Sequence, residues 1–153
     1  KQLRSETTKH LVDAIQAHDQ LPVGPEVVEL NCPPEGTRVS VEQIVQDWKS
    51  KGLCKPSDVA LIGPRKWLKD SSVSEDAKIC GFDVADYNED LLGSVSYIGA
   101  HRSKGMDFLA VILIDFASFE ELSADSKRVD FQEAYFLGAS RARQLLGVVS
   151  VEV

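Results

Sequence analysis

The sequence predicts an α/β domain in which helices flank a mainly parallel β-sheet, and three observations support this. Apolar runs of strand length alternate along the chain with stretches whose apolar residues recur at helical spacing. These runs are nearly continuous in Val, Ile and Leu, which is typical of strands covered on both faces. The length of 153 residues corresponds to about one domain. We therefore expect a single domain over residues 1–153.

Two helices are expected in the first third of the chain. The apolar residues of positions 6–19 recur at helical spacing, and a short strand-like run follows at 27–30. Two prolines and a glycine in the segment 32–36 (CPPEG) interrupt regular structure and predict a loop. Ser40 and Gln43 have the spacing of a capping box, which predicts a second helix from Ser40 to near Gly52. The apolar stripe of that helix consists of Val41, Ile44, Val45 and Trp48.

The rest of the chain contains the strongest strand signals. The segment 64–93 is ambiguous and is expected to hold a short helix and one weak strand. A last helix is expected over 130–144, and it leads directly into a strand at 145–151. Further apolar runs of strand length lie at 58–62, 95–98 and 109–114.

The charge of the chain is unevenly distributed. The formal net charge is −7, which alone argues against a general nucleic-acid-binding protein, because phosphate neutralisation needs clustered cations. Seven carboxylates and one lysine between positions 70 and 90 account for −6 of this charge. Such a run usually forms a solvated acidic loop. The remainder of the chain is therefore nearly neutral.

Three features bear on where the protein is found. No apolar run approaches the roughly 18 residues of a membrane span, so no membrane association is expected. The start at Lys1 has no signal-peptide pattern, and because the only methionine is Met106, we expect the chain to begin inside a longer protein. The cysteines Cys32, Cys54 and Cys80 are odd in number and lack metal-ligand spacing, so we expect buried thiols, no metal site and a cytoplasmic location.

The segment 101–105 (HRSKG) is a candidate ligand-binding loop. It follows a predicted strand, and loops at the carboxyl ends of parallel strands are where α/β sheets bind ligands. It supplies two fixed cations, a histidine and a glycine that allows close approach. It is not a phosphate-binding P-loop, because the GxxxxGK[ST] pattern is absent from the chain. A plain polar turn is the alternative interpretation.

The predicted last helix presents one arginine at the edge of its apolar stripe. At about 100° per residue, Arg141 lies at the margin of the stripe and Arg143 lies on the other side. An arginine there can reach a neighbouring surface while its stem stays packed, or it can be a snorkelling or ion-paired structural residue. The stripe consists of Phe131, Ala134, Tyr135, Gly138 and Ala142.

These two stretches resemble motifs of superfamily 1 helicases of the UvrD/Rep type. Residues 95–113 (VSYIGAHRSKGMDFLAVIL) are similar to motif V, roughly TxHxxKGLEF before an apolar strand. Residues 134–143 (AYFLGASRAR) are similar to motif VI, roughly LYVAxTRAR. Residues 2–5 (QLRS) resemble motif IV, NYRS, and residues 58–64 resemble the strand between motifs IV and V. The resemblance implies the second RecA-like domain of such a helicase, which has a P-loop NTPase-type fold but no P-loop of its own.

The resemblance also implies a role for each matching residue. ATP with Mg²⁺ would lie between this domain and a first RecA-like domain of the same polypeptide, which would hold most of it. Arg141 and Arg4 match the catalytic arginines of motifs VI and IV. Gly105 and Asp107 match the ATP-binding end of motif V, with Asp107 at the nucleotide ribose. The single-stranded DNA would be contacted by His101, Arg102 and Lys104.

Some residues depart from the family pattern and leave alternatives open. Gly99 stands where the family has threonine, Asp107 replaces glutamate and Met106 replaces leucine. We expect the isolated chain to hydrolyse no ATP, whether or not the parent protein is a helicase. The first alternative is a catalytically degenerate RecA-like binding or scaffold domain. The second is an α/β domain unrelated to helicases.

Overall fold

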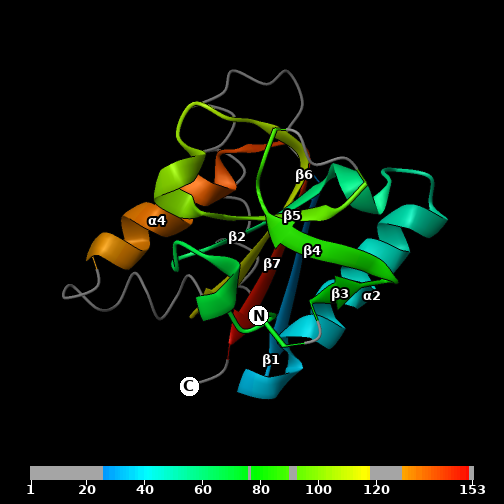
Figure 1. The fold of residues 1–153 in the computed structure, drawn as a ribbon, viewed down its shortest axis with the longest axis horizontal. Coiled ribbons are helices and arrows are strands. Elements are labelled where there is room, and N and C mark those ends of the chain that lie inside the picture. The colour runs from blue at the N-terminus through cyan, green and yellow to red at the C-terminus, as the bar shows by residue number, and fades with distance from the viewer. Residues whose placement is uncertain (1–25, 76, 90–92, 118–128, 152–153) are drawn as a thin grey trace, which may run out of the picture.

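A mixed, mainly parallel sheet forms the centre of the domain in the computed structural model, which describes residues 26–75, 77–89, 93–117 and 129–151. In these residues the sheet has seven strands in the order β1-β7-β6-β2-β5-β4-β3 (Figure 1). The paired strands run parallel except β3 and β4, which are antiparallel. The strands are β1 (Glu26–Cys32), β2 (Val59–Gly63), β3 (Lys78–Ile79), β4 (Phe82–Asp86), β5 (Val95–Gly99), β6 (Phe108–Phe116) and β7 (Ala142–Val151).

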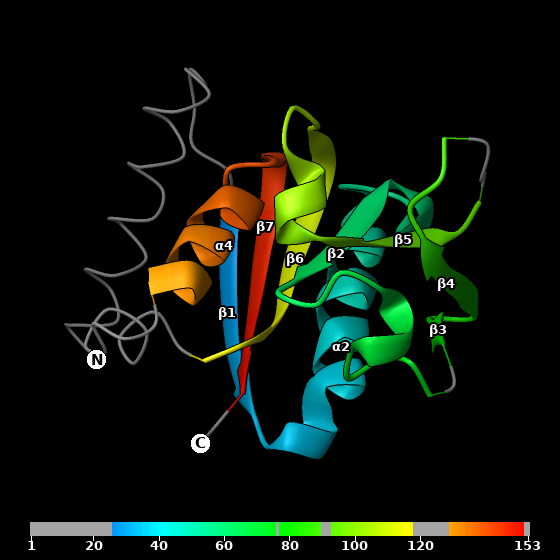
Figure 2. The ribbon, with the colours of Figure 1, turned by 60° about the vertical axis from the view of Figure 1, so that its left-hand side comes forward.

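Helices cover both faces of this sheet. Helix α2 (Thr37–Ser50) packs on one face, and helix α4 (Val129–Ala139) packs on the other together with the 3₁₀ turn η4 (Ala100–Ser103), as Figure 2 shows. Successive strand residues contribute to opposite layers, since Leu61 packs in the α2 layer and Ile62 in the α4 layer. All five residues of β2 are buried. The predicted α/β class and the covered, mainly parallel strands are therefore confirmed.

Helix α2 confirms the predicted stripe but begins earlier than predicted. Its stripe residues Val41, Ile44, Val45 and Trp48 are buried. The helix starts at Thr37, with Gly36 as the cap residue and no side-chain cap bond, so the predicted capping box is wrong. The 3₁₀ turn η1 (Pro34–Gly36) occupies the predicted loop and leads straight into the helix, which places Ser40 inside it. At the other end, Gly52 has φ +71° and ends the helix where the sequence indicates.

The ambiguous segment 64–93 contains more strand than predicted. The 3₁₀ helix η3 (Leu68–Asp70) is followed by the hairpin of β3 and β4. The hairpin turns on Cys80 and Gly81, which both have positive φ as a two-residue type I′ turn requires. The described part of the acidic run is thus partly a hairpin and not only a loop, although Asp83 keeps 75% of its side chain exposed.

The end of the chain corrects the predicted last helix. Helix α4 ends at Ala139 and β7 begins at Ala142, so Arg141 lies in a turn and Arg143 in a strand. The helical sequence pattern continues past Ala139, but β7 begins to pair with β6 at Ala142 and Phe108. This pairing ends the helix earlier than the local sequence predicts. Ala134 and Tyr135 are buried as predicted, whereas Phe131 is 41% exposed. Gly138 allows close helix packing, because a Cβ there would lie 2.9 Å from both Ile62 and Leu113.

Other sequence predictions have mixed outcomes. The helix expected over 6–19 and Arg4 lie outside the described residues. All three cysteines are free thiols, but only Cys32 is buried and the other two are partly exposed. Burial, with a smaller contribution from the Asp58 carboxylate, raises the pKa of the Cys54 thiol to about 11. None of the described helices combines the length and the apolar character needed to cross a membrane.

Candidate functional site

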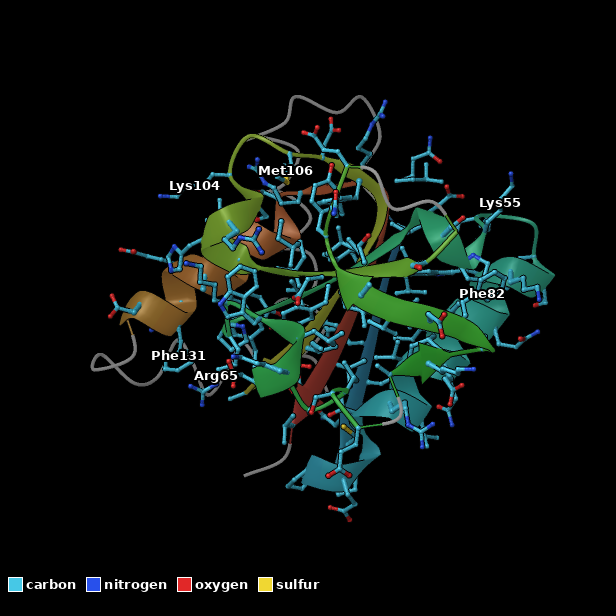
Figure 3. All side chains as sticks on the ribbon, viewed as in Figure 1. Lys55, Arg65, Phe82, Lys104, Met106 and Phe131 are labelled. Atoms are coloured by element: carbon cyan, nitrogen blue, oxygen red, sulfur yellow. The ribbon has the colours of Figure 1, made fainter. Side chains whose placement is uncertain are left out.

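The carboxyl ends of two adjacent parallel strands bring two loops together. Gly63 at the end of β2 pairs with Gly99 at the end of β5. The segment 64–67 and the loop 100–107 therefore leave the same edge of the sheet side by side. The prediction that the loop containing His101 and Lys104 begins at a carboxyl strand end is confirmed. In Figure 3 Arg65 and Lys104 both lie on the side of the view that α4 occupies.

The loop after β5 folds as a compact turn packed on α4. Residues Ala100–Ser103 form η4. The hydroxyl group of the buried Ser103 donates a hydrogen bond to the carbonyl oxygen of Ala100. Gly105 has φ +78°, a conformation that favours glycine, and it turns the chain towards β6. His101 and Lys104 are exposed on this turn, whereas Ser103 is the residue that fixes it. The loop thus presents a histidine and a lysine to solvent on a packed base.

Arg141 connects this loop to the turn that precedes β7. Its Nη1 donates to the carbonyl oxygen of Met106 at 3.2 Å, and its Nη2 donates to the Ser140 hydroxyl at 2.9 Å. Its Nε lies 3.3 Å from the carbonyl oxygen of Leu137. The backbone amide of Phe108 donates to the Arg141 carbonyl oxygen at 2.9 Å. Arg141 is 8% exposed, so it is more deeply held than a residue at the margin of a helix stripe.

A second arginine lies on the exposed side of the same junction. The Nε of Arg143 is 3.9 Å from a carboxylate oxygen of Asp107, and both side chains are mostly exposed. An ion pair of this length and exposure contributes little to stability. Both groups are therefore accessible to a ligand. Asp107 and Arg141 directly precede the paired residues Phe108 and Ala142, so they lie together at the amino ends of β6 and β7, at the opposite end of the loop from Arg102. Gly105 lies two residues before Asp107.

The predicted residues thus fall into two groups joined by one short loop. His101 and Arg102 lie near the carboxyl end of β5, while Asp107 and Arg141 lie where β6 and β7 begin. The loop crosses between these edges over the α4 face. The predicted catalytic residue Arg4 lies outside the described residues.

Trp67, which the sequence analysis does not predict as a site residue, lies next to Arg102. The guanidinium carbon of Arg102 lies 4.5 Å from the centre of the Trp67 ring, and the Lys66 amine lies 5.2 Å from it. Trp67 is 38% exposed. The sequence signal was the run Arg65, Lys66 and Trp67 directly after a predicted strand. Only the adjacency of β2 and β5 brings Arg102 to it.

The glycine at position 99 has a steric cause. A Cβ at Gly99 would lie 2.9 Å from the carbonyl oxygen of Arg65 and 3.0 Å from the Cα of Lys66. Both neighbours are backbone atoms, so they cannot simply rotate away. The segment 64–67 passes so close to Gly99 that the threonine of the helicase pattern would not fit there without a movement of this segment.

Tyr97 holds that segment in place. Its hydroxyl donates to the carbonyl oxygen of Arg65 at 2.7 Å. Burial raises the pKa of Tyr97, and the carboxylates of Asp115 and Asp86 raise it further. The phenol therefore stays protonated and remains a hydrogen-bond donor. Beyond Trp67, the amide of Leu68 donates to an Asp86 carboxylate oxygen at 2.8 Å, so the segment is fixed on both sides of the tryptophan.

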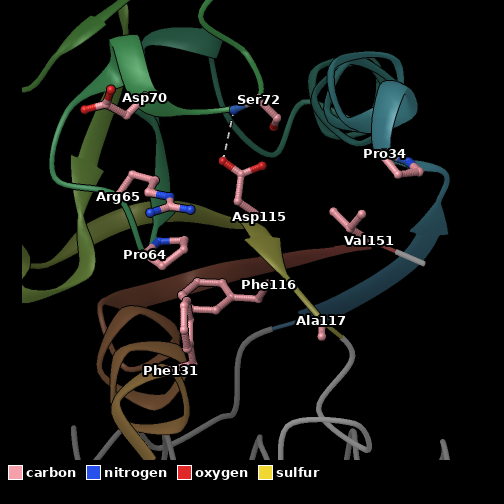
Figure 4. A pocket seen from close by; sticks show the side chains of 10 residues that line it. All are labelled: Pro34, Pro64, Arg65, Asp70, Ser72, Asp115, Phe116, Ala117, Phe131 and Val151. Carbon is pink, nitrogen blue, oxygen red and sulfur yellow. Dashed lines mark hydrogen bonds between the residues drawn. The ribbon is translucent and has the colours of Figure 1, made fainter. Parts of the chain in front are cut away.

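A pocket of about 400 Å³ opens at the carboxyl edge beyond this segment (Figure 4). Asp115, in an irregular part of β6 with φ +66°, accepts a hydrogen bond from the Ser72 amide at 3.1 Å. Among the residues that the structure describes, none that is predicted to bind ATP or DNA lines the pocket. Its lining residues are Pro34, Pro64, Arg65, Asp70, Ser72, Asp115, Phe116, Ala117, Phe131 and Val151.

The fold defines an α/β domain with a mainly parallel seven-stranded sheet in the described residues, and this architecture matches a helicase C-terminal domain. The match is to the crystal structure of the C-terminal domain of a possible DNA helicase from Lactobacillus plantarum WCFS1, with a TM-score of 0.60. The two are 22% identical, and the match covers 92% of this chain and 81% of the other. At this identity the likeness is one of fold. No protein-family model matches the chain, and no curated protein matches it.

Proposed function

We propose that this chain is the second RecA-like motor domain of an ATP-dependent superfamily 1 DNA helicase or translocase of the UvrD/Rep type. The observation that carries the proposal is the pairing of Phe108 with Ala142, directly next to Arg141. It joins the loop similar to motif V to the turn similar to motif VI, two stretches that a motor domain must move together. The fold likeness to a helicase C-terminal domain supports the same assignment.

In this proposal the chain supplies cations to an ATP site that a first RecA-like domain completes. Mg²⁺ bound with ATP would neutralise part of the phosphate charge. No group of three His, Cys, Asp or Glu side chains in the described part of the chain is arranged to hold a metal, so we assign no metal ligand there. Arg141 and Arg4 would stabilise the charge that develops on the γ-phosphate. Asp107 and Gly105 would face the nucleoside.

Arg141 must exchange partners to act in this way. Its hydrogen bonds include those to neutral oxygens of Met106, Leu137 and Ser140. Arginine and phosphate are both charged and frequently pair through two parallel hydrogen bonds, which adds energy and geometric specificity to the pair. Arrival of a γ-phosphate would therefore draw the guanidinium away from the Met106 carbonyl and release the base of the loop.

That exchange gives a route from ATP to the DNA strand. Met106 follows Lys104 and Gly105 directly, so a change at its carbonyl alters the loop that presents His101 and Lys104. These residues and Arg102 would contact the phosphates of single-stranded DNA. Closing and reopening of the cleft between two RecA-like domains would then move the domain along the strand.

One observation favours a second candidate, a degenerate RecA-like binding or scaffold domain. Arg141 is nearly buried and its guanidinium is engaged by the domain itself. An arginine with a purely structural role would look the same. In that case the domain would bind a partner without taking part in ATP turnover.

The two candidates differ in the ATPase activity of the full-length protein. The motor-domain proposal expects ATP hydrolysis that single-stranded DNA stimulates and that depends on Arg141. The scaffold alternative expects no turnover above a sample without protein, or turnover that is indifferent to Arg141. Steady-state phosphate release with and without a single-stranded oligonucleotide measures this difference.

A further inference from the structure

Trp67 is an exposed aromatic ring held in a fixed position. The two tryptophans of the chain differ in this respect, since Trp48 is fully buried whereas Trp67 is 38% exposed. The Arg65 carbonyl before Trp67 is held by the Tyr97 hydroxyl, and the Leu68 amide after it is held by Asp86. A ring presented on a fixed backbone loses little conformational freedom when a ligand binds.

Two cations lie over this ring, and one of them has a donor atom without a partner among the described residues. We call Lys66, Trp67 and Arg102 the tryptophan cluster. Both cations lie within 5.2 Å of the ring centre. The Nη1 of Arg102 is buried and has no hydrogen-bond partner among the described residues. Arg102 as a whole is partly exposed, and a guanidinium carries five N–H donors, so it can also offer donors to an acceptor oxygen at the surface.

The two cations and the aromatic ring of the tryptophan cluster together favour a ligand that has both negative charges and flat rings. The chain as a whole has a net charge of −7, yet Arg65, Lys66 and Lys69 are concentrated in the short segment that follows β2. Single-stranded nucleic acid combines phosphates with unpaired bases, and aromatic side chains between cations are the usual means of binding it. Double-stranded nucleic acid keeps its bases stacked inside and offers no free ring face to a tryptophan.

We propose that Trp67 stacks on an unpaired base of a nucleic-acid strand while Lys66 and Arg102 bind the adjacent phosphates. This inference deepens the proposed function and rests on it for the identity of the strand, but it adds a residue outside all the helicase-like motifs. Trp67 then fixes the position of the strand next to His101 and Lys104. Gly99 contributes by admitting the 65–66 backbone that places the ring there.

Intrinsic fluorescence of the 153-residue chain tests the stacking directly. Oligothymidine added at low salt is expected to quench the wild-type emission, because a base stacked on Trp67 lies against its indole. The matched variant is Trp67→Phe, which keeps an aromatic ring and leaves only the buried Trp48 as an emitter. Its emission is expected to stay unchanged while the oligonucleotide still binds. An abasic strand of equal length supplies phosphates alone and is expected to cause no quenching.

Affinity for a labelled oligothymidine, measured by fluorescence anisotropy, provides a second readout. Trp67→Ala is expected to weaken binding roughly tenfold, with Trp67→Phe between it and the wild type. The inference is wrong if oligothymidine leaves the emission unchanged, if the abasic strand quenches equally, or if Trp67→Ala binds as the wild type does. These outcomes do not touch the proposed function, because that is judged by the Arg141-dependent ATPase of the full-length protein.

Discussion

The Arg141 guanidinium donates to the Met106 carbonyl oxygen across 35 positions of sequence, at 3.2 Å. This bond fixes the end of the β5–β6 loop against the turn before β7. Arg141 is therefore a structural residue of the resting domain, whatever it does with a nucleotide.

Loss of the Arg141 side chain is expected to destabilise the domain. Arg141→Ala removes bonds to three oxygens and leaves the Met106 carbonyl without its partner, so we expect a loss of about 2 kcal/mol in the free energy of unfolding. Arg143→Ala is the matched control, because Arg143 is exposed and should cost at most about 0.5 kcal/mol. Urea unfolding of both variants measures the difference. Equal stabilities would contradict the structural role of Arg141.

Tyr97→Phe is expected to lower stability near neutral pH by about 1 kcal/mol, because it removes the hydrogen bond to the Arg65 carbonyl. The pKa of Tyr97 is raised in the folded state, so the stability linked to this phenol is fully present below its unfolded pKa of about 10 and is lost as the pH rises through the folded value. The gap between wild type and variant should therefore narrow above pH 10. Denaturant titrations at pH 7 and pH 11 check this, and a gap of constant size would contradict it.

Gly99→Thr restores the residue of the helicase pattern and is expected to harm the fold. Its Cβ would meet the Arg65 carbonyl oxygen and the Lys66 Cα at 3.0 Å or less, so the segment must move, at a cost of about 1–3 kcal/mol. Ser96→Thr on the same strand is partly exposed and serves as the control. Thermal melts compare the two. A Gly99→Thr variant as stable as the control would show that the segment 64–67 moves aside freely.

The isolated chain is expected to hydrolyse no ATP. It lacks the GxxxxGK[ST] pattern that cradles the β- and γ-phosphates, and cations alone do not position an attacking water. Phosphate release by the 153-residue chain, with and without single-stranded DNA, should equal that of a heat-denatured sample. Turnover above that level would mean that the chain contains a complete site.

The sequence predicted the elements whose local pattern and final environment agree. The runs that became β2, β5 and β6 are apolar on both sides because both faces are covered, so composition alone indicated buried parallel strands. The end of α4 was missed because residues 140–144 continue a helical pattern, and only pairing of Ala142 with Phe108 turns them into a strand. Long-range pairing of this kind is not contained in a local window.

The parts of the candidate site that depend on local sequence could be predicted, and those that depend on long-range contacts could not. The loop 101–105 was found from its position after a strand and its cations. The partner of Arg102 was not, because Trp67 reaches it only through the pairing of β2 with β5. The burial of Arg141 was also missed, since its acceptor on Met106 is distant in sequence.

The proposed role of Arg141 in ATP turnover is tested by the ATPase rate of the full-length protein in which Arg141 is replaced by alanine. Ile44→Val is the control for general destabilisation, because Ile44 is buried in the α2 layer, on the face of the sheet opposite α4, and carries no charge. At saturating single-stranded DNA, and at a temperature where both variants are folded by circular dichroism, the proposal predicts that Arg141→Ala loses roughly 10³-fold or more in turnover while Ile44→Val stays within a few-fold of wild type. If both variants hydrolyse ATP at similar rates, Arg141 is structural only and the chain does not act as the proposed motor domain.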